Sequence, residues 1–356
     1  MDTHQPPSQQ TNFRTQAAML GVCAAILSCA ALYVAETIFA PLAFALFIIA
    51  ITWPLQRFLQ ARMARLVAVA ITTAAIIIVI VAFAMLLAWA AGRVGQFIVN
   101  DAARLQALYG SLTSWLEGHG VELAGLWASY FRGDQLLRLA QEVTTRLNTA
   151  LSFLIVVFIY VLLGLLEVDD ACARLHAWRQ GSLGTVLLTG GANAATKLRR
   201  YMLVRTQMSA ITGLLVWVFA WLAGLPLALE WGVIAFALNF IPFIGPFIAT
   251  MFPTVFAVAQ FASWPAAVAI FACLNVIQFV VGSYLEPRFV GNALSISPFI
   301  VLFSVFFWTF LWGLPGAFIG VPIVIVLLSL CEVHSSTHWI ADLFGASPLR
   351  EPRTQD

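Results

Sequence analysis

The chain has 356 residues, of which 62% are hydrophobic and 10% are charged, and its formal net charge is +2. Ordinary soluble domains carry about 25% charged residues, so a soluble globule of this size has too few charges to cover so much apolar surface. The composition excludes a disordered chain, a nucleic-acid-binding domain and an ordinary soluble enzyme. It predicts an all-α, polytopic integral membrane protein.

Residues 1–16 are polar and are predicted as an N-terminal tail. A transmembrane helix needs about 20 apolar residues, with a range of about 17–25. We predict about six spans at the apolar runs 17–34, 38–53, 66–91, 150–166, 208–223 and 264–281. The first three runs make an N-terminal transmembrane region, 17–91, and the others belong to a transport region, 150–330. Residues 331–356 are predicted as a cytoplasmic C-terminal tail.

A polar insert at 92–149 separates the two transmembrane regions. Leu105, Leu108 and Leu112 recur there at helical spacing, so we predict amphipathic helices. A solvated helical cap is the favoured interpretation, and a lid or an oligomer contact is the alternative.

The positions of the basic residues predict the orientation. Arg57, Arg62 and Arg65 lie between the second and third runs, and six further bases lie between the fourth and fifth. Positively charged loops stay in the cytoplasm. Both loops are therefore predicted inside, and the insert 92–149 is predicted to be extracytoplasmic.

Two apolar runs, 231–260 and 298–330, are too long for one span and are interrupted in the middle. The interruptions contain Pro242, Gly245 and Pro246 in the first run, and Gly313, Pro315 and Gly316 in the second. The longest flanking pieces reach only about 22 Å at about 1.5 Å per residue, and a hydrocarbon core is about 30 Å thick. We predict two re-entrant helical hairpins, which enter the membrane from opposite sides, with tips at 242–246 and 313–316.

Hairpin tips of this kind leave backbone N–H and C=O groups without helical partners, so they are suited to binding a small polar solute. Asn239, just before the first tip, either binds the solute or satisfies the broken backbone. The alternative to the hairpins is that proline and glycine only kink two continuous spans.

The last predicted span carries polar residues at helical spacing. Asn275, Gln278, Gly282 and Glu286 fall on one face of an α-helix, which suggests the lining of a solute path. Glu286 has either a role in that path or a structural ion pair with Arg288.

Motifs for other chemistries are absent or weak. Cys331, His334, His338 and Asp342 have a spacing that zinc can use, but a polar helix end produces the same pattern, so no metal is predicted. The sequence has no P-loop and no serine-hydrolase or zinc-protease motif, so we predict neither a cofactor nor an enzyme.

Three stretches resemble the autoinducer-2 exporter (AI-2E) family. They are 239–246, which reads NFIPFIGP, 284–291, which reads YLEPRFVG, and 297–322, which contains WGLPG. The basic stretch 197–201, KLRRY, is similar to the helix before the family's fifth hydrophobic segment. The resemblance is strongest over 190–330. It implies a homo-oligomeric, pentameric transporter of the bacterial inner membrane in which two hairpins move against a scaffold.

The residues and the resemblance together predict a secondary transporter that exports a small polar metabolite, with autoinducer-2 as the favoured solute. The alternatives are a sodium/proton antiporter that titrates Glu286, and a membrane scaffold that transports nothing. The partners are membrane lipid, the solute and further copies of the chain, with no nucleic acid. The candidate residues for binding or gating are Asn239, Pro242, Gly245, Pro246, Asn275, Gln278, Glu286, Arg288, Gly313, Pro315 and Gly316.

Overall fold

The computed structural model describes residues 7–100, 133–177, 182–261, 263–290 and 296–345. Within these ranges every element is helical apart from one isolated β-bridge between Ile296 and Gly345, so the all-α prediction is confirmed. The N-terminal half contains α1 (Pro7–Val34), α2 (Glu36–Gln60), α3 (Arg65–Asn100) and α6 (Gly133–Ala177). The C-terminal half contains α7 (Ser182–Thr185), the π-helix η1 (Val186–Gly190), α8 (Gly191–Leu222), α9 (Ala228–Leu238), α10 (Ile244–Phe261), α11 (Trp264–Phe279), the π-helix η2 (Val280–Leu285), α12 (Glu286–Val290), α13 (Pro298–Val333) and α14 (His338–Phe344).

Six helices in the described residues are long and apolar enough to cross a membrane, as the sequence predicts for a polytopic protein. They are Glu36–Gln60, Arg65–Phe97, Thr149–Ala177, Val186–Leu222, Trp264–Leu285 and Pro298–Val333. Five of them contain a predicted span. The predicted first span lies in α1 instead, whose apolar stretch Met19–Val34 is shorter than a full span, and the sixth helix contains the second predicted hairpin.

Several helices run beyond the limits that the apolar runs suggest. Helix α1 already begins at Pro7, and α3 continues to Asn100, within the predicted polar insert. Four of the bases predicted to lie in a loop before residue 208 lie on a helical rod, Val186–Leu222, which is 37 residues long: Lys197, Arg199, Arg200 and Arg205. Charge does not stop these helices, because Arg and Lys are good helix formers when their ends reach water. Residues 101–132 of the insert lie outside the described part of the chain.

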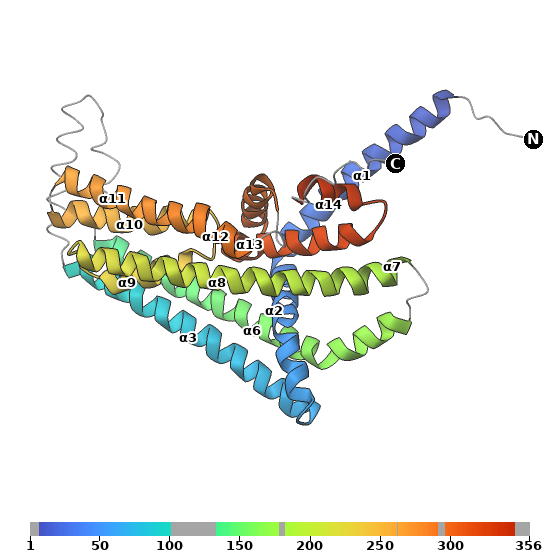
Figure 1. Ribbon diagram of the computed structural model, residues 1–356, viewed down its shortest axis with the longest axis horizontal. Helices are drawn as coiled ribbons and strands as arrows, with labels where there is room; N and C mark the ends of the chain where they lie inside the picture. The colour runs from blue at the N-terminus through green and yellow to red at the C-terminus, as the bar shows by residue number, and fades with distance from the viewer. Residues whose placement is uncertain (1–6, 101–132, 178–181, 262, 291–295, 346–356) are drawn as a thin grey trace, which may run out of the picture.

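The long helices lie side by side in an elongated bundle. Figure 1 shows α9 beside α8 and α10 beside α11, with α3 and α6 below them and α2 crossing the bundle. Helix α1 extends away from this body, and Val34 at its end is 82% exposed.

Glycine allows α8 and α9 to pack closely. A Cβ added to Gly213 of α8 would lie 2.8 Å from the Gly232 carbonyl oxygen of α9. Small residues are the usual means of bringing membrane helices together, since lipid offers no hydrophobic force between them.

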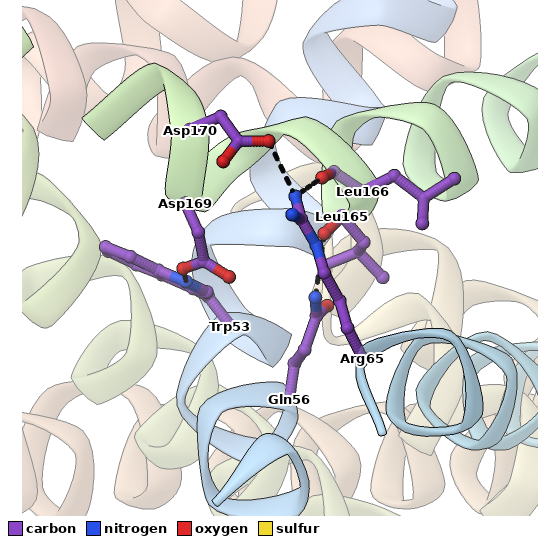
Figure 2. Close-up of polar contacts among 7 residues, drawn as sticks. All are labelled: Trp53, Gln56, Arg65, Leu165, Leu166, Asp169 and Asp170. Atoms are coloured by element: carbon purple, nitrogen blue, oxygen red, sulfur yellow. Dashed lines mark hydrogen bonds and ion pairs between the residues drawn. The ribbon is translucent and has the colours of Figure 1, made fainter. Parts of the chain in front are cut away.

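One end of α2 and the start of α3 are both joined to α6 by hydrogen bonds, which Figure 2 shows. Trp53 Nε1 donates to Asp169 Oδ1 at 3.1 Å, and Gln56 Nε2 donates to the Leu165 carbonyl oxygen at 2.7 Å. Arg65 donates to the Leu166 carbonyl oxygen and pairs with Asp170 at 3.0 Å. We call these contacts the α2–α6 clamp.

Candidate functional site

The first interruption is a tight turn between two antiparallel helices. Phe243 has a φ of +63°, and the Ile244 N–H donates to the Pro242 carbonyl oxygen at 2.7 Å. A Cβ on Gly245 would lie 1.8 Å from the Leu238 carbonyl oxygen. Further from the turn, the Trp231 and Phe256 rings are 4.9 Å apart. Helices α9 and α10 therefore form a hairpin, hairpin 1, with Gly245 at the point of closest approach.

The second interruption has the same construction. Trp312 and Gly313 leave the helical conformation, with Gly313 at φ +61°. A Cβ on Gly316 would lie 1.8 Å from the Trp308 carbonyl oxygen, and one on Gly320 would lie 3.0 Å from that of Ser304.

In a straight helix, positions sixteen residues apart would be separated by about 24 Å. The two parts of α13 on either side of Gly313 therefore run antiparallel and form hairpin 2, and the kinked-rod alternative is wrong for both interruptions.

The tips of the two hairpins meet. Phe240 of the first tip stacks on Phe318 of hairpin 2 with ring centroids 6.0 Å apart. Ile241 lies in the same buried cluster as Leu311 and Trp312. The two tips thus share one buried cluster, to which Ile241 and Ile244 contribute from hairpin 1 and Leu311, Trp312, Ala317 and Phe318 from hairpin 2, and the sequence pattern alone gave no reason to join them.

Helix α8 presents two buried polar groups to this region. Asn239 Nδ2 donates to Ser209 Oγ at 3.2 Å, and both residues are buried. One turn earlier on the same helix, Arg205 Nη1 pairs with Glu286 at 3.0 Å. The Arg205 side chain is 6% exposed and that of Glu286 is 27% exposed. We call these four residues the α8 polar line.

The α8 polar line and Thr212, three residues after Ser209 on α8, also carry unused hydrogen-bonding capacity. Arg205 Nε and Thr212 Oγ1 are buried and have no hydrogen-bond partner in the described part of the chain. Charged groups inside membrane spans are costly and are therefore functional candidates. A buried donor without a partner costs free energy that a polar solute can recover.

The predicted stripe on α11 is not assembled into one site. Asn275 is exposed and donates to the Phe271 carbonyl oxygen of its own helix at 2.8 Å. The half-buried Gln278 has a buried Nε2 without a partner among the described residues, and Gly282 has open space around it. The π-helix η2 begins at Val280, after Asn275 and Gln278, so the regular helical spacing used in the sequence analysis does not extend to Glu286.

Glu286 has a different partner from the one that the sequence suggested. The structural pair considered from sequence was Arg288, but Glu286 faces Arg205 on α8. Arg288 instead lies over the Tyr284 ring, 4.1 Å from its centroid. Sequence reasoning missed Arg205 because it was counted only as a topology signal. Its spacing of four from Ser209 was the available indication that the two share a helix face.

Other ion pairs connect the hairpins to the rest of the bundle. The buried Glu230 at the start of α9 accepts from Arg93 Nε of α3 at 3.1 Å. Lys197 of α8 pairs with Glu332, near the end of hairpin 2, at 2.5 Å.

Of the four residues with zinc-like spacing, His338 pairs with Asp342 at 2.9 Å. No group of three or more ligating side chains is found among the described residues.

The fold and the site define a class: a multi-pass α-helical membrane protein in which two helical hairpins meet beside buried polar groups. The family model for AI-2E family transporters matches residues 22–335. This chain therefore belongs to the AI-2E transporter family.

Among its relatives is the AI-2 transport protein TqsA of Escherichia coli (strain K12), which is 29% identical over 329 residues, covering 92% of this chain and 94% of that protein. A putative transport protein of Borreliella burgdorferi is 29% identical over 199 residues, covering 56% of this chain and 55% of that protein. The putative transport protein YhhT of Escherichia coli (strain K12) is 32% identical over 162 residues, covering 46% of this chain and 44% of that protein.

Proposed function

We propose that this protein is a secondary transporter of the bacterial inner membrane that exports autoinducer-2 or a closely similar small polar metabolite. The observation that carries the proposal is the α8 polar line beside the meeting point of the two hairpin tips. It offers a carboxamide, a hydroxyl and an ion pair to a solute with several hydroxyl groups. The relative named an AI-2 transport protein, which matches along most of both chains, supports the choice of solute.

The proposed mechanism uses the hairpins as re-entrant elements. Each tip stops part-way through the bilayer, and its free backbone groups and Asn239 bind the solute. Movement of the hairpins against the remaining helices then exposes the site to the other side. The ion pairs Arg93–Glu230 and Lys197–Glu332 connect the hairpins to that scaffold, and a homo-oligomer holds the scaffold still.

Efflux of autoinducer-2 from proteoliposomes, with and without a proton gradient, tests this function. We expect wild-type protein to accelerate efflux and Asn239→Ala to slow it by about tenfold, the equivalent of one to two hydrogen bonds. The matched control is Asn275→Ala, because that amide bonds only to its own helix. Equal efflux from wild-type, Asn239→Ala and protein-free vesicles would contradict the proposal and favour a scaffold that transports nothing.

One observation favours a cation/proton antiporter as the second candidate. Glu286 is a carboxylate in a membrane-spanning region, next to the buried Arg205, and such carboxylates serve proton relays. The antiporter predicts that Glu286→Gln abolishes sodium-dependent proton movement in sealed vesicles. Export of the polar metabolite predicts no sodium-dependent proton movement in the wild type.

A further inference from the structure

A cavity of about 820 Å³ lies far from the hairpin tips, between the end of α2, the last turns of α6 and the start of the rod formed by η1 and α8. Asn193 in its lining precedes Arg205 by twelve residues, which corresponds to about 18 Å along a helix. Binding pockets for small molecules have volumes of about 300–1,000 Å³. The proposed transport site does not include this cavity.

Two opposite walls of the cavity offer donors without partners. On α2, the Arg57 guanidinium lies 5.4 Å from the Trp53 ring centroid and makes no hydrogen bond or ion pair within the described ranges. Gln60 Nε2 is buried and likewise has no partner there. On the rod formed by η1 and α8, the exposed residues Thr189 and Asn193 line the same cavity. The Thr189 wall is a π-helix, and π-helices are frequent at functional sites.

The third wall, on α6, supplies an acceptor. Asp169 uses Oδ1 to accept from Trp53 Nε1 and keeps Oδ2 for another donor. His176 Nδ1 is held by the Cys172 carbonyl oxygen at 2.8 Å, so Nε2 is the nitrogen left for a ligand. Among the described lining residues, the cavity thus combines the cation of Arg57 and the anion of Asp169 with several neutral donors.

This arrangement fits a ligand with an oxyanion at one end and an N–H donor at the other. Donors on two facing walls suit a tetrahedral phosphate, and Arg is the side chain that binds phosphate most specifically. The free carboxylate oxygen of Asp169 suits an ammonium group. Leu187 and Leu188 provide apolar surface for the remainder of the ligand.

We propose that this cavity binds a phosphate ester that carries a primary ammonium group, the chemistry of phosphoethanolamine. The source is either a phosphatidylethanolamine headgroup or a free metabolite of the same chemistry. The positions of Trp53 and Arg57 agree with both, because aromatic and basic residues gather at the cytoplasmic interface of a membrane.

Native mass spectrometry of the full-length protein in detergent tests the inference with three probes: dihexanoyl phosphatidylethanolamine, dihexanoyl phosphatidylcholine and glycerophosphoethanolamine. The two lipids share the phosphate, but only the first has N–H donors. We expect the wild type to bind the ethanolamine lipid more tightly than the choline lipid. Arg57→Gln should weaken both lipids by about tenfold or more, and Asp169→Asn should weaken only the ethanolamine lipid.

Matched controls lie just outside the cavity. Arg62→Gln changes an arginine that lies over the Phe58 ring, and Asp170→Asn changes the partner of Arg65. Neither should alter binding of any probe. If Arg57→Gln lowers the thermal unfolding temperature, Asn193→Ala replaces it as the test variant, and we expect it to weaken the binding of both lipids.

The three probes also distinguish the two sources. Binding of the lipid alone assigns a membrane headgroup, and binding of glycerophosphoethanolamine as well assigns a soluble ligand; either result supports the site. Equal binding of the two lipids, or equal losses in Arg57→Gln and Arg62→Gln, would overturn the proposal.

Discussion

At the scale of single residues, Gly316 and Gly245 have no room for a side chain. In each case an added Cβ would lie 1.8 Å from a backbone carbonyl oxygen across the hairpin, that of Trp308 or Leu238. Backbone cannot move aside as a flexible side chain does, so the two arms would have to separate. These glycines allow the two arms of each hairpin to pack this closely.

We therefore expect Gly316→Ala to lower the free energy of unfolding by about 3 kcal/mol or more. The measurement is thermal unfolding of the full-length protein in detergent. Gly282→Ala is the matched control, since a Cβ at Gly282 would meet nothing within 4 Å. Equal unfolding temperatures for Gly316→Ala and the wild type would show that Gly316 and the Trp308 carbonyl oxygen lie far enough apart to admit a side chain.

At the scale of secondary-structure elements, the α2–α6 clamp fixes two long helices that otherwise share mainly apolar contacts. Gln56 is fully buried, and its amide donates across the interface to the Leu165 carbonyl oxygen at 2.7 Å. Trp53 and Arg65 add hydrogen bonds from the same end to Asp169 and Asp170, as Figure 2 shows.

Truncation of Gln56 should loosen this interface. We expect Gln56→Ala to lower the free energy of unfolding by about 1–3 kcal/mol, because it removes the bond and leaves a void. Leu55→Ala, at an exposed position of the same helix, should have little effect. Chemical unfolding of the two variants side by side checks this, and equal losses would mean that the clamp contributes nothing.

At the scale of the whole molecule, the proposed re-entry of the hairpins fixes which chain segments share a side of the membrane. Hairpin 1 should have both ends outside, and hairpin 2 should have both ends inside. In a cysteine-free background, an impermeant maleimide should label Leu229→Cys and Phe261→Cys from outside. It should label Ser297→Cys and Ser335→Cys only in inside-out vesicles.

The labelling has a clear contrary result. If α13 crossed the membrane from end to end, positions 297 and 335 would react from opposite sides. The folded-back arms at Gly313 make that outcome incompatible with the hairpin geometry. Leu20→Cys on α1 provides an exposed reference position in the same background.

Much of the fold was predictable from local patterns. Apolar runs that are too long for one span and are interrupted by clustered proline and glycine indicated both hairpins, whereas single prolines such as Pro41 and Pro253 lie inside continuous helices. The exact limits of the helices were not predictable from hydropathy, since Arg and Lys on α8 do not end a helix. The π-helix η2 has no distinct sequence signal either, and the pairing of Glu286 with Arg205 of α8 was not predictable from the spacing of residues on α11.

The amino-acid sequence by itself determined that this is a helical membrane protein, where its chain turns back and to which family it belongs, because each of these depends on neighbouring residues or on short motifs. Only the tertiary structure decided that the two tips touch, that Asn239 meets Ser209 and that Glu286 meets Arg205. Pairings of this kind depend on how separate helices pack. The energy of such packing comes from shape and close approach, which no single stretch of sequence records.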